Sequence, residues 1–219
     1  MVNTRIIDSE PALILENDKK NLVISDLHIG FEHKFSSNKI PNSKNSSVND
    51  IITNVKKIIK KENPDTLILL GILIPANHDA NITRLIPDNV TLISSKGMII
   101  DDVLLTHGHT MPSKNYSNVN NIIMGHIHPV YFDENSLLNG ERIWISIKTD
   151  KSKIFPSTKG KINITIIPSF NPYFYAAEKR YYKKSISPIV EKIKDSSIAK
   201  IATLDGTIIG NESIINQIL

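Results

Sequence analysis

Residues 22–28 read Leu-Val-Ile-Ser-Asp-Leu-His, an apolar run that ends in an aspartate and a histidine two positions apart. A short apolar run of this kind is typical of a buried strand. In open α/β sheets the carboxyl ends of the strands line the ligand crevice, so Asp26 and His28 are expected at such an edge. On an extended backbone, side chains two positions apart point to one side, and we therefore expect this pair to chelate together.

Three further segments have the same character. Each follows an apolar run: Ala76-Asn77-His78-Asp79, Thr106-His107-Gly108-His109 and Gly125-His126-Ile127-His128. His33 is the one histidine of the chain outside these four segments, and we interpret it as a surface residue. A lone histidine is most often an ordinary core or surface residue, but four clusters at strand ends favour one shared metal site.

The types of donor narrow the choice of ion. The segments combine carboxylate, amide and imidazole groups, and the chain contains no cysteine. Thiolate metal sites, disulfides and a cysteine nucleophile are therefore excluded. Imidazole with oxygen donors favours manganese, iron, zinc or nickel over calcium.

Apolar runs and periodicity indicate an α/β fold with a buried, mostly parallel sheet. Residues 48–61 carry isoleucines and a valine at helical spacing with lysines opposite, which predicts a helix. The polar stretch Ser36–Ser47 is expected to be a loop. The expected strands are Ala12–Leu15, Leu22–Ser25, Thr66–Leu70, Val90–Ser94, Val103–Thr106 and Ile122–Met124, then Arg142–Ile147 and Lys161–Ile167 in a second sheet, with a hairpin from Ala199–Leu204 to Thr207–Ile209.

Length and charge set broad bounds. The 219 residues fit one domain, and the net charge of +4 is mildly basic, which suits a polyanionic partner such as nucleic acid. The lysine clusters at 56–61 and 179–184 have the spacing of solvated helix or loop surfaces. The sequence shows no signal segment and no apolar run of membrane-spanning length, so we expect a cytoplasmic protein with no membrane partner.

The four segments resemble, in order and strand context, the signature of the calcineurin-like metallophosphoesterases: Asp-x-His, Gly-Asp, Gly-Asn-His-Asp, a strand ending in His, and Gly-His-x-His. The resemblance extends to archaeal ICC-like, SbcD-related predicted phosphoesterases through Pro168–Pro172, Ser187-Pro188 and Leu204–Gly210. It therefore spans nearly the whole chain.

This resemblance implies an αββα sandwich of two mixed β-sheets flanked by helices, and hydrolysis of phosphate esters with two divalent ions, manganese before iron, zinc or nickel. It implies that Asp26, His28 and His128 bind one ion and that Asn77, His107 and His126 bind the other. His107 is preferred to His109 because the first histidine of that strand end is the usual ligand. His78 would be the catalytic histidine, with its ring held by Asp79. Ala76 replaces the usual glycine without removing a ligand.

One departure concerns the ligand that bridges the two ions. In the family the strand matching Leu67–Gly71 ends in Gly-Asp, whereas here Ile72 follows Gly71. Residues 72–75 would also form the next parallel strand, although parallel strands need a crossover of roughly a dozen residues. Residues 1–219 thus resemble a single domain that lacks a crossover segment between Gly71 and Ile72, either because the sequence is short of that segment or because the protein has lost it.

Three functions stay open from the sequence. The first is a phosphodiesterase or nuclease, with DNA as a candidate substrate and aromatic residues at 173–182 as candidate stacking platforms. The second is hydrolysis of a small phosphate ester, a cyclic nucleotide or a phosphoprotein by the same centre. The third is a catalytically impaired binding protein of the same fold that lacks the bridging aspartate. The oligomeric state does not follow from the sequence.

Overall fold

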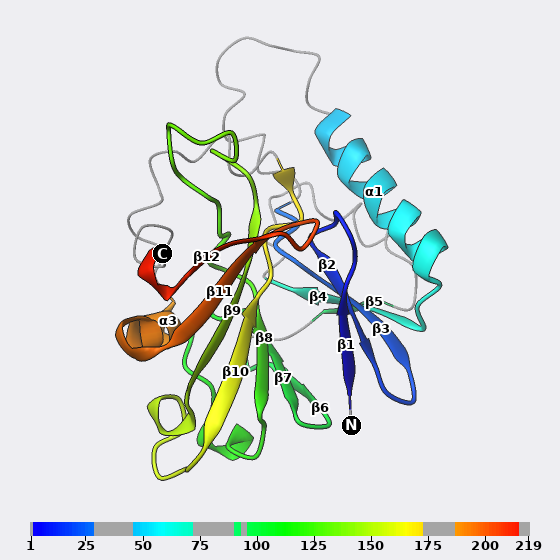
Figure 1. Ribbon diagram of the computed structural model, residues 1–219. Helices are drawn as coiled ribbons and strands as arrows, with labels where there is room; N and C mark the ends of the chain where they lie inside the picture. The colour runs from blue at the N-terminus through cyan, green and yellow to red at the C-terminus, as the bar shows by residue number, and fades with distance from the viewer. Residues whose placement is uncertain (1, 29–45, 72–89, 93–95, 173–186, 215–219) are drawn as a thin grey trace, which may run out of the picture.

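The computed structural model describes residues 2–28, 46–71, 90–92, 96–172 and 187–214. In these ranges the chain forms two β-sheets packed face to face (Figure 1). The five-stranded sheet has the order β1 (Asn3–Ile6), β2 (Ala12–Glu16), β3 (Lys20–Ser25), β4 (Thr66–Leu70) and β5 (Val90–Leu92). The seven-stranded sheet has the order β12 (Ile208–Asn211), β11 (Ile198–Thr203), β9 (Ile143–Asp150), β10 (Lys161–Ile166), β8 (Asn121–Met124), β7 (Val103–Thr106) and β6 (Met98–Ile100).

Both sheets are mixed. Strands β3, β4 and β5 are parallel, whereas β1 and β2 are antiparallel additions at one edge. In the other sheet β7, β8 and β10 are parallel, and β9 is antiparallel to both β10 and β11. The parallel strands place their carboxyl ends at one edge of each sheet, which is where the candidate site lies.

Helices cover the outer faces of the two sheets. Helix α1 (Ser46–Glu62) lies against the five-stranded sheet, and α3 (Pro188–Ile193) lies against the seven-stranded sheet (Figure 1). Short 3-10 helices occur at Lys114–Tyr116, Lys151–Lys153, Lys194–Ser196 and Glu212–Ile214. The order of layers is therefore helix, sheet, sheet, helix, and the expected αββα sandwich of two mixed sheets is confirmed.

The layers arise because successive side chains of a strand face opposite sides of the sheet. On β3, Leu22 and Ile24 pack in the cluster that contains Ile51 and Ile58 of α1, while Val23 packs in the cluster between the two sheets. Successive residues of a strand face opposite sides of the sheet, so an uninterrupted apolar run is needed when both faces are buried. Burying each isoleucine of α1 contributes roughly 1.5–3 kcal/mol of hydrophobic stabilisation.

The carboxyl end of α1 is fixed by charge. Glu62 is 8% exposed, and its Oε2 atom lies 2.5 Å from Arg5 Nη2 and 3.3 Å from Lys20 Nζ. The hydrogen bond from Arg5 holds the pKa of the Glu62 carboxyl below its usual value, against the opposing effect of burial. These contacts join strands β1 and β3 to the carboxyl end of α1, the helix that comes after Asp26 and His28 in the sequence.

Some elements differ from the sequence-based expectations. Strands β1 and β6 and helix α3 were not expected, because β1 is exposed along its length and the other two are only three and six residues long. The loop expected at Ser36–Ser47 is wrong at its end, since Ser46 and Ser47 begin α1, and its residues 36–45 lie outside the described ranges. The second sheet and the terminal hairpin of β11 and β12 are confirmed.

Strand β4 pairs with β3 on one side and with β5 on the other. The connection from β4 to β5 consists of residues 71–89, of which all but Gly71 lie outside the described ranges. The expected strand at 72–75 falls in this connection. The missing crossover segment therefore stays a hypothesis. In the described part of the chain, no helix is long and apolar enough to cross a membrane.

Candidate metal centre

Three of the four histidine segments meet at the carboxyl edge between the sheets. Asp26 directly follows Ser25, the last residue of β3, and His107 directly follows the last residue of β7. His126 comes two residues after the end of β8. The fourth segment, with Asn77, His78 and Asp79, lies outside the described residues, as does His33.

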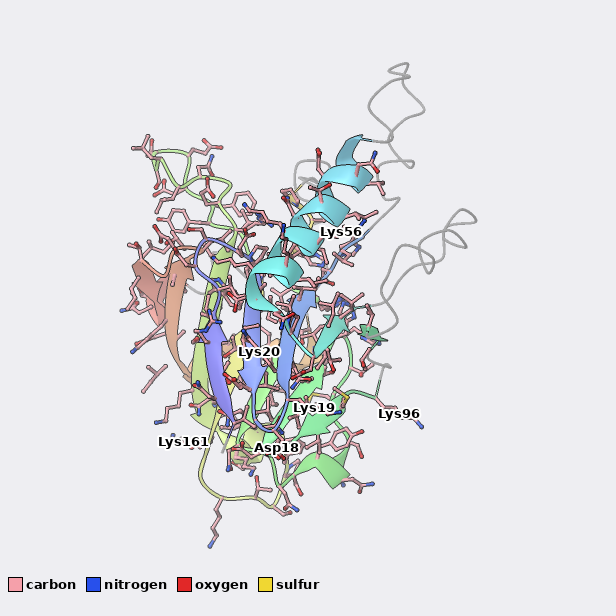
Figure 2. All side chains as sticks on the ribbon, turned by 90° about the vertical axis from the view of Figure 1, so that its right-hand side faces the viewer. Asp18, Lys19, Lys20, Lys56, Lys96 and Lys161 are labelled. Carbon is pink, nitrogen blue, oxygen red and sulfur yellow. The ribbon has the colours of Figure 1, made fainter. Side chains whose placement is uncertain are left out.

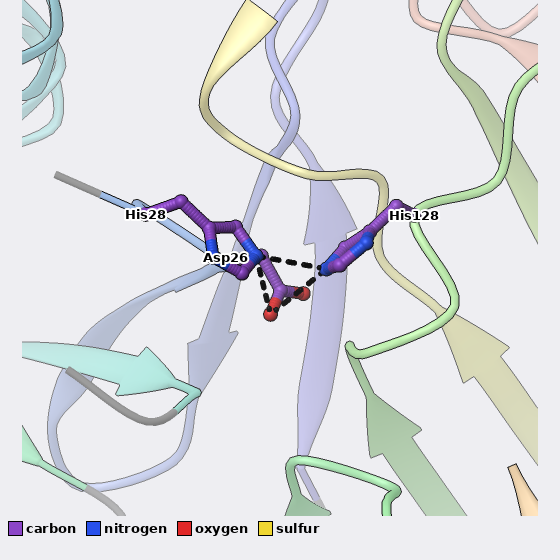
Figure 3. Close-up of side chains that lie close together, drawn as sticks. All are labelled: Asp26, His28 and His128. Atoms are coloured by element: carbon purple, nitrogen blue, oxygen red, sulfur yellow. Dashed lines mark hydrogen bonds and ion pairs between the residues drawn. The ribbon is translucent and has the colours of Figure 1, made fainter. Parts of the chain in front are cut away.

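Asp26, His28 and His128 form a compact group whose potential ligand atoms all lie within 4.8 Å of one another (Figure 3). Asp26 Oδ1 lies 3.3 Å from His128 Nε2 and 3.7 Å from His28 Nε2. The Nε2 atoms of the two histidines are 3.0 Å apart. Asp26 is buried, and both imidazoles are 13% exposed, so the group is shielded yet reachable.

These separations fit one divalent ion. With metal–ligand bonds of about 2.0–2.1 Å and tetrahedral angles, two ligand atoms lie roughly 3.3 Å apart. The three distances of 3.0, 3.3 and 3.7 Å bracket this value. Two histidines and one carboxylate leave coordination positions open, which is the composition of a catalytic rather than a closed structural site.

His107 and His126 also lie near the carboxylate of Asp26. His107 Nε2 is 3.0 Å from Asp26 Oδ1, and the ring centroids of His107 and His126 are 4.8 Å apart. His109 is farther from the carboxylate, because its Nδ1 atom lies 3.1 Å from Nδ1 of His107 and its ring faces that histidine. The structure thus brings together five of the six expected ligands, all but Asn77. His109 lies at the Nδ1 atom of His107, whereas Asp26 lies at its Nε2 atom.

Electrostatics favour an ionised Asp26 and neutral imidazoles at His28 and His126. Burial raises the pKa of Asp26, but the attraction of His128 and the hydrogen bonds with His107 and His128 outweigh it and hold that pKa well below its usual value. Burial lowers the pKa of His28 to about 4, and burial with the field of His107 lowers that of His126 to about 4. A metal ligand must be deprotonated, so these groups are ready to bind an ion at neutral pH.

The second oxygen of Asp26 is occupied by the protein. Asp26 Oδ2 accepts a hydrogen bond from the backbone N–H of His126 at 2.9 Å and lies against the Ser25 hydroxyl. The same hydroxyl is 3.1 Å from the carbonyl of Leu70 at the end of β4. Its single hydrogen serves one of these acceptors at a time. The contacts orient the carboxylate and leave Oδ1 facing the imidazoles.

Gly125 makes this packing possible. A Cβ atom at that position would lie 1.7 Å from Ser25 Oγ and 2.6 Å from Asp26 Oδ2, far closer than real contacts allow. Gly71 also approaches the carboxylate, since its Cβ would lie 3.4 Å from Asp26 Oδ1. Segments from both sheets therefore close around Asp26.

The expectation that an extended backbone makes residues two positions apart, such as Asp26 and His28, point to one side is wrong here. The backbone is not extended at these pairs: φ is 54° at Asp26, 42° at His28, 71° at His126 and 50° at His128. A non-glycine residue in the left-handed region is uncommon, and such strain gathers at functional sites. Asp26 and His28 do lie together, but left-handed backbone conformations after β3 bring them there.

Comparisons with known proteins give little beyond this geometry. No protein-family model matches the chain, and no curated protein matches it. Among solved structures, the chain is similar to the crystal structure of the Pseudomonas putida nuclease MPE, with 14% sequence identity, a TM-score of 0.47, and coverage of 93% of this chain and 98% of that one. A TM-score below 0.5 does not establish a shared fold, so the interpretation depends on the residues described above.

Sequence reasoning missed residues that organise the centre without being ligands. Ser25 was read only as the end of a strand, although its hydroxyl reaches both Asp26 and Leu70. Gly125 was named as part of a histidine segment, whereas the structure shows a close approach of two sheets at this residue. No pattern in the sequence near Ser25 signals its partner, because Leu70 is 45 positions away.

Proposed function

We propose that this protein is a metal-dependent phosphoesterase that hydrolyses phosphodiester or phosphomonoester bonds. The observation that carries the proposal is the convergence of Asp26, His28 and His128 at the carboxyl edge of the parallel strands. A site with two imidazoles, one carboxylate and open positions suits metal-assisted hydrolysis. The resemblance of the sequence segments to calcineurin-like metallophosphoesterases supports the same class.

The resemblance to the calcineurin-like metallophosphoesterases suggests the roles of the residues. Asp26, His28 and His128 would hold one divalent ion, and His107 and His126, with Asn77, would hold a second one, manganese being the first candidate. When bound, such ions supply Lewis acidity, which activates water and neutralises charge on a phosphoryl group. His78 would give a proton to the leaving oxygen, and Asp79 would fix the tautomer of its ring.

The substrate is proposed only by class. DNA is one candidate, since the chain carries a net charge of +4. Lys19, Lys20, Lys56 and Lys96 are spread over one side of the molecule and do not form one patch (Figure 2). Charge therefore does not distinguish nucleic acid from a smaller phosphate ester.

Metal content and turnover test the proposal together. We expect chelator-treated protein to lose hydrolysis of bis-p-nitrophenyl phosphate and to regain it with Mn²⁺. Asp26→Asn should abolish both bound metal and turnover. Asp150→Asn, which removes an exposed carboxylate paired with Lys161, is the control and should change neither. Wild-type protein that binds no divalent ion would refute the proposal.

The alternative is a catalytically impaired binding protein of this fold. It is favoured by Ile72 after Gly71, because the position where a bridging carboxylate is expected carries an apolar residue. In the described ranges, every histidine–carboxylate contact involves Asp26. One tightly bound ion per chain without turnover of either a phosphodiester or a phosphomonoester would support this alternative. Sequencing the gene across codons 71 and 72 would show whether a crossover segment is missing.

A further inference from the structure

The backbone of residues 25–28, at the end of β3 and just after it, is held by one other segment. The carbonyl groups of four consecutive residues, Ser25 to His28, accept hydrogen bonds from Ser169, Phe170 and Asn171. The donors and distances are Phe170 N to Ser25 O at 2.8 Å, Ser169 Oγ to Asp26 O at 2.9 Å, and Asn171 Nδ2 to Leu27 O at 3.0 Å and to His28 O at 3.4 Å. The donor segment begins three residues after the end of β10.

This loop needs such support. Asp26 and His28 adopt left-handed φ values of 54° and 42°, which L-amino acids other than glycine rarely adopt. A strained backbone persists only when its surroundings hold it, and a buried carbonyl without a partner costs about 1–3 kcal/mol. Ser169 and Asn171 are 4% and 1% exposed, so water does not compete for their hydrogen bonds.

The donor segment is itself fixed by Arg142. Nη1 of this residue donates to the carbonyl groups of Ser169 and Phe170, at 2.9 Å each. Burial lowers the pKa of the guanidinium from its usual value, while Glu10 and Glu141 counter the effect. The contacts form a chain of support from Arg142 through Ser169 and Asn171 to the backbone of Asp26 and His28.

We propose that Ser169 and Asn171, braced by Arg142, are positioning residues that set the geometry of Asp26 and His28 for metal binding. Their hydrogen bonds go to the backbone of the two ligands, and they act through that backbone. The inference rests on the proposed metal-dependent function. It assigns a role to the Pro168–Pro172 stretch, which the sequence marked only by resemblance.

A merely structural role would lower stability and leave metal affinity alone. Asn21 provides the matched control, because it is also a buried asparagine whose Nδ2 donates to two carbonyls, Leu15 O at 3.1 Å and Lys19 O at 3.2 Å. It lies near the opposite end of β3 from Asp26. Asn21→Ala and Asn171→Ala thus each remove two hydrogen bonds from a side-chain amide to backbone carbonyls, near opposite ends of β3.

The test is calorimetric titration of metal-free protein with Mn²⁺, together with urea unfolding of the same samples. We expect Asn171→Ala and Ser169→Ala to weaken Mn²⁺ binding about 10- to 100-fold, as is usual for residues that orient metal ligands. Ser169→Thr keeps the hydroxyl and should restore most of the affinity. Asn21→Ala should bind Mn²⁺ like wild type.

The outcomes separate two failures. If wild-type protein takes up no Mn²⁺, the proposed function fails first. If wild type binds and the Ser169 and Asn171 variants bind equally well, the positioning role is wrong and the metal site stands. If Asn171→Ala does not fold, the Ser169→Ala and Ser169→Thr pair decides, since equal affinity in that pair would overturn the inference.

Discussion

His107 Nε2 lies 3.0 Å from Asp26 Oδ1, although the two residues are 81 positions apart and belong to different sheets. The same oxygen faces His28 and His128 at 3.7 and 3.3 Å. One carboxylate oxygen is therefore common to both groups of histidines, in a site where the sequence shows no aspartate after Gly71. Among the described residues, Asp26 would therefore be the one shared between the two proposed ions.

Replacing His107 and His109 separately tests this arrangement. His107→Ala removes a nitrogen that faces Asp26, whereas His109→Ala removes a ring that lies against His107 and has its centroid 6.0 Å from that of His126. We expect His107→Ala to reduce the number of Mn²⁺ ions bound per chain. His109→Ala should keep the stoichiometry and weaken affinity by about tenfold at most. Elemental analysis after gel filtration measures the Mn²⁺ content of both variants. An equal loss of Mn²⁺ in the two variants would contradict the assignment.

Gly125→Ala tests the contact between the sheets. The added Cβ would lie 1.7 Å from Ser25 Oγ, so the two segments must separate. We expect a loss of stability of several kcal/mol, above the 1–3 kcal/mol that is typical of overpacking. Gly160→Ala is the control, because nothing lies within 4 Å of its added Cβ, and it should cost only about 1 kcal/mol through its positive φ of 94°. Urea unfolding of both variants gives the comparison.

A second-site change checks the cause. Ser25→Gly removes the side chain that Gly125→Ala would strike, so the double variant should recover part of the lost stability. Additive effects of the two changes would mean that the cost arises elsewhere.

Buried parallel strands are the part of the fold that the sequence predicts well. Thr66–Leu70 was expected as a strand and is β4 with the same bounds, because an apolar run buried on both faces is conspicuous. Asn3–Ile6 was missed, since all four residues are exposed and the strand is held by pairing with β2 and by the contact of Arg5 with the distant Glu62. The edge strands depend on neighbours that no local pattern reveals.

The candidate site was predictable to a similar extent. Asp26, His28 and His128 could be grouped because each follows a strand end, and strand ends meet at one edge. The hydrogen bonds from Ser169 and Asn171 could not be predicted, because they join residues 143 and 144 positions apart in the sequence. That contact depends on β10 lying parallel to β8 in the second sheet, which is a property of the sheet order.

Asp26→Asn tests the centre through stability. Ligand that binds only the folded state stabilises it by about 2.7 kcal/mol at a free concentration of 100 times Kd. We expect Mn²⁺ to raise the melting temperature of the wild type and to leave that of Asp26→Asn unchanged, because a neutral amide oxygen is a much weaker partner for a cation. Asp150→Asn should show the full wild-type shift. A similar Mn²⁺-dependent shift in Asp26→Asn would place the bound ion elsewhere.

The stability of the metal-free protein should fall as pH decreases from about 6.5 toward 4. The pKa of His28 and of His126 is about 4 in the folded protein, below the usual 6.5 of an unfolded chain. Between these values the unfolded state binds more protons, so the free energy of unfolding rises with pH. The stabilisation contributed by the two neutral histidines is fully present above pH 6.5. His28 alone should contribute a change on the order of 1–3 kcal/mol. Urea unfolding at several pH values in the presence of a chelator measures the slope, and His28→Gln should reduce it. An unchanged slope in that variant would show that His28 is not held neutral by its burial.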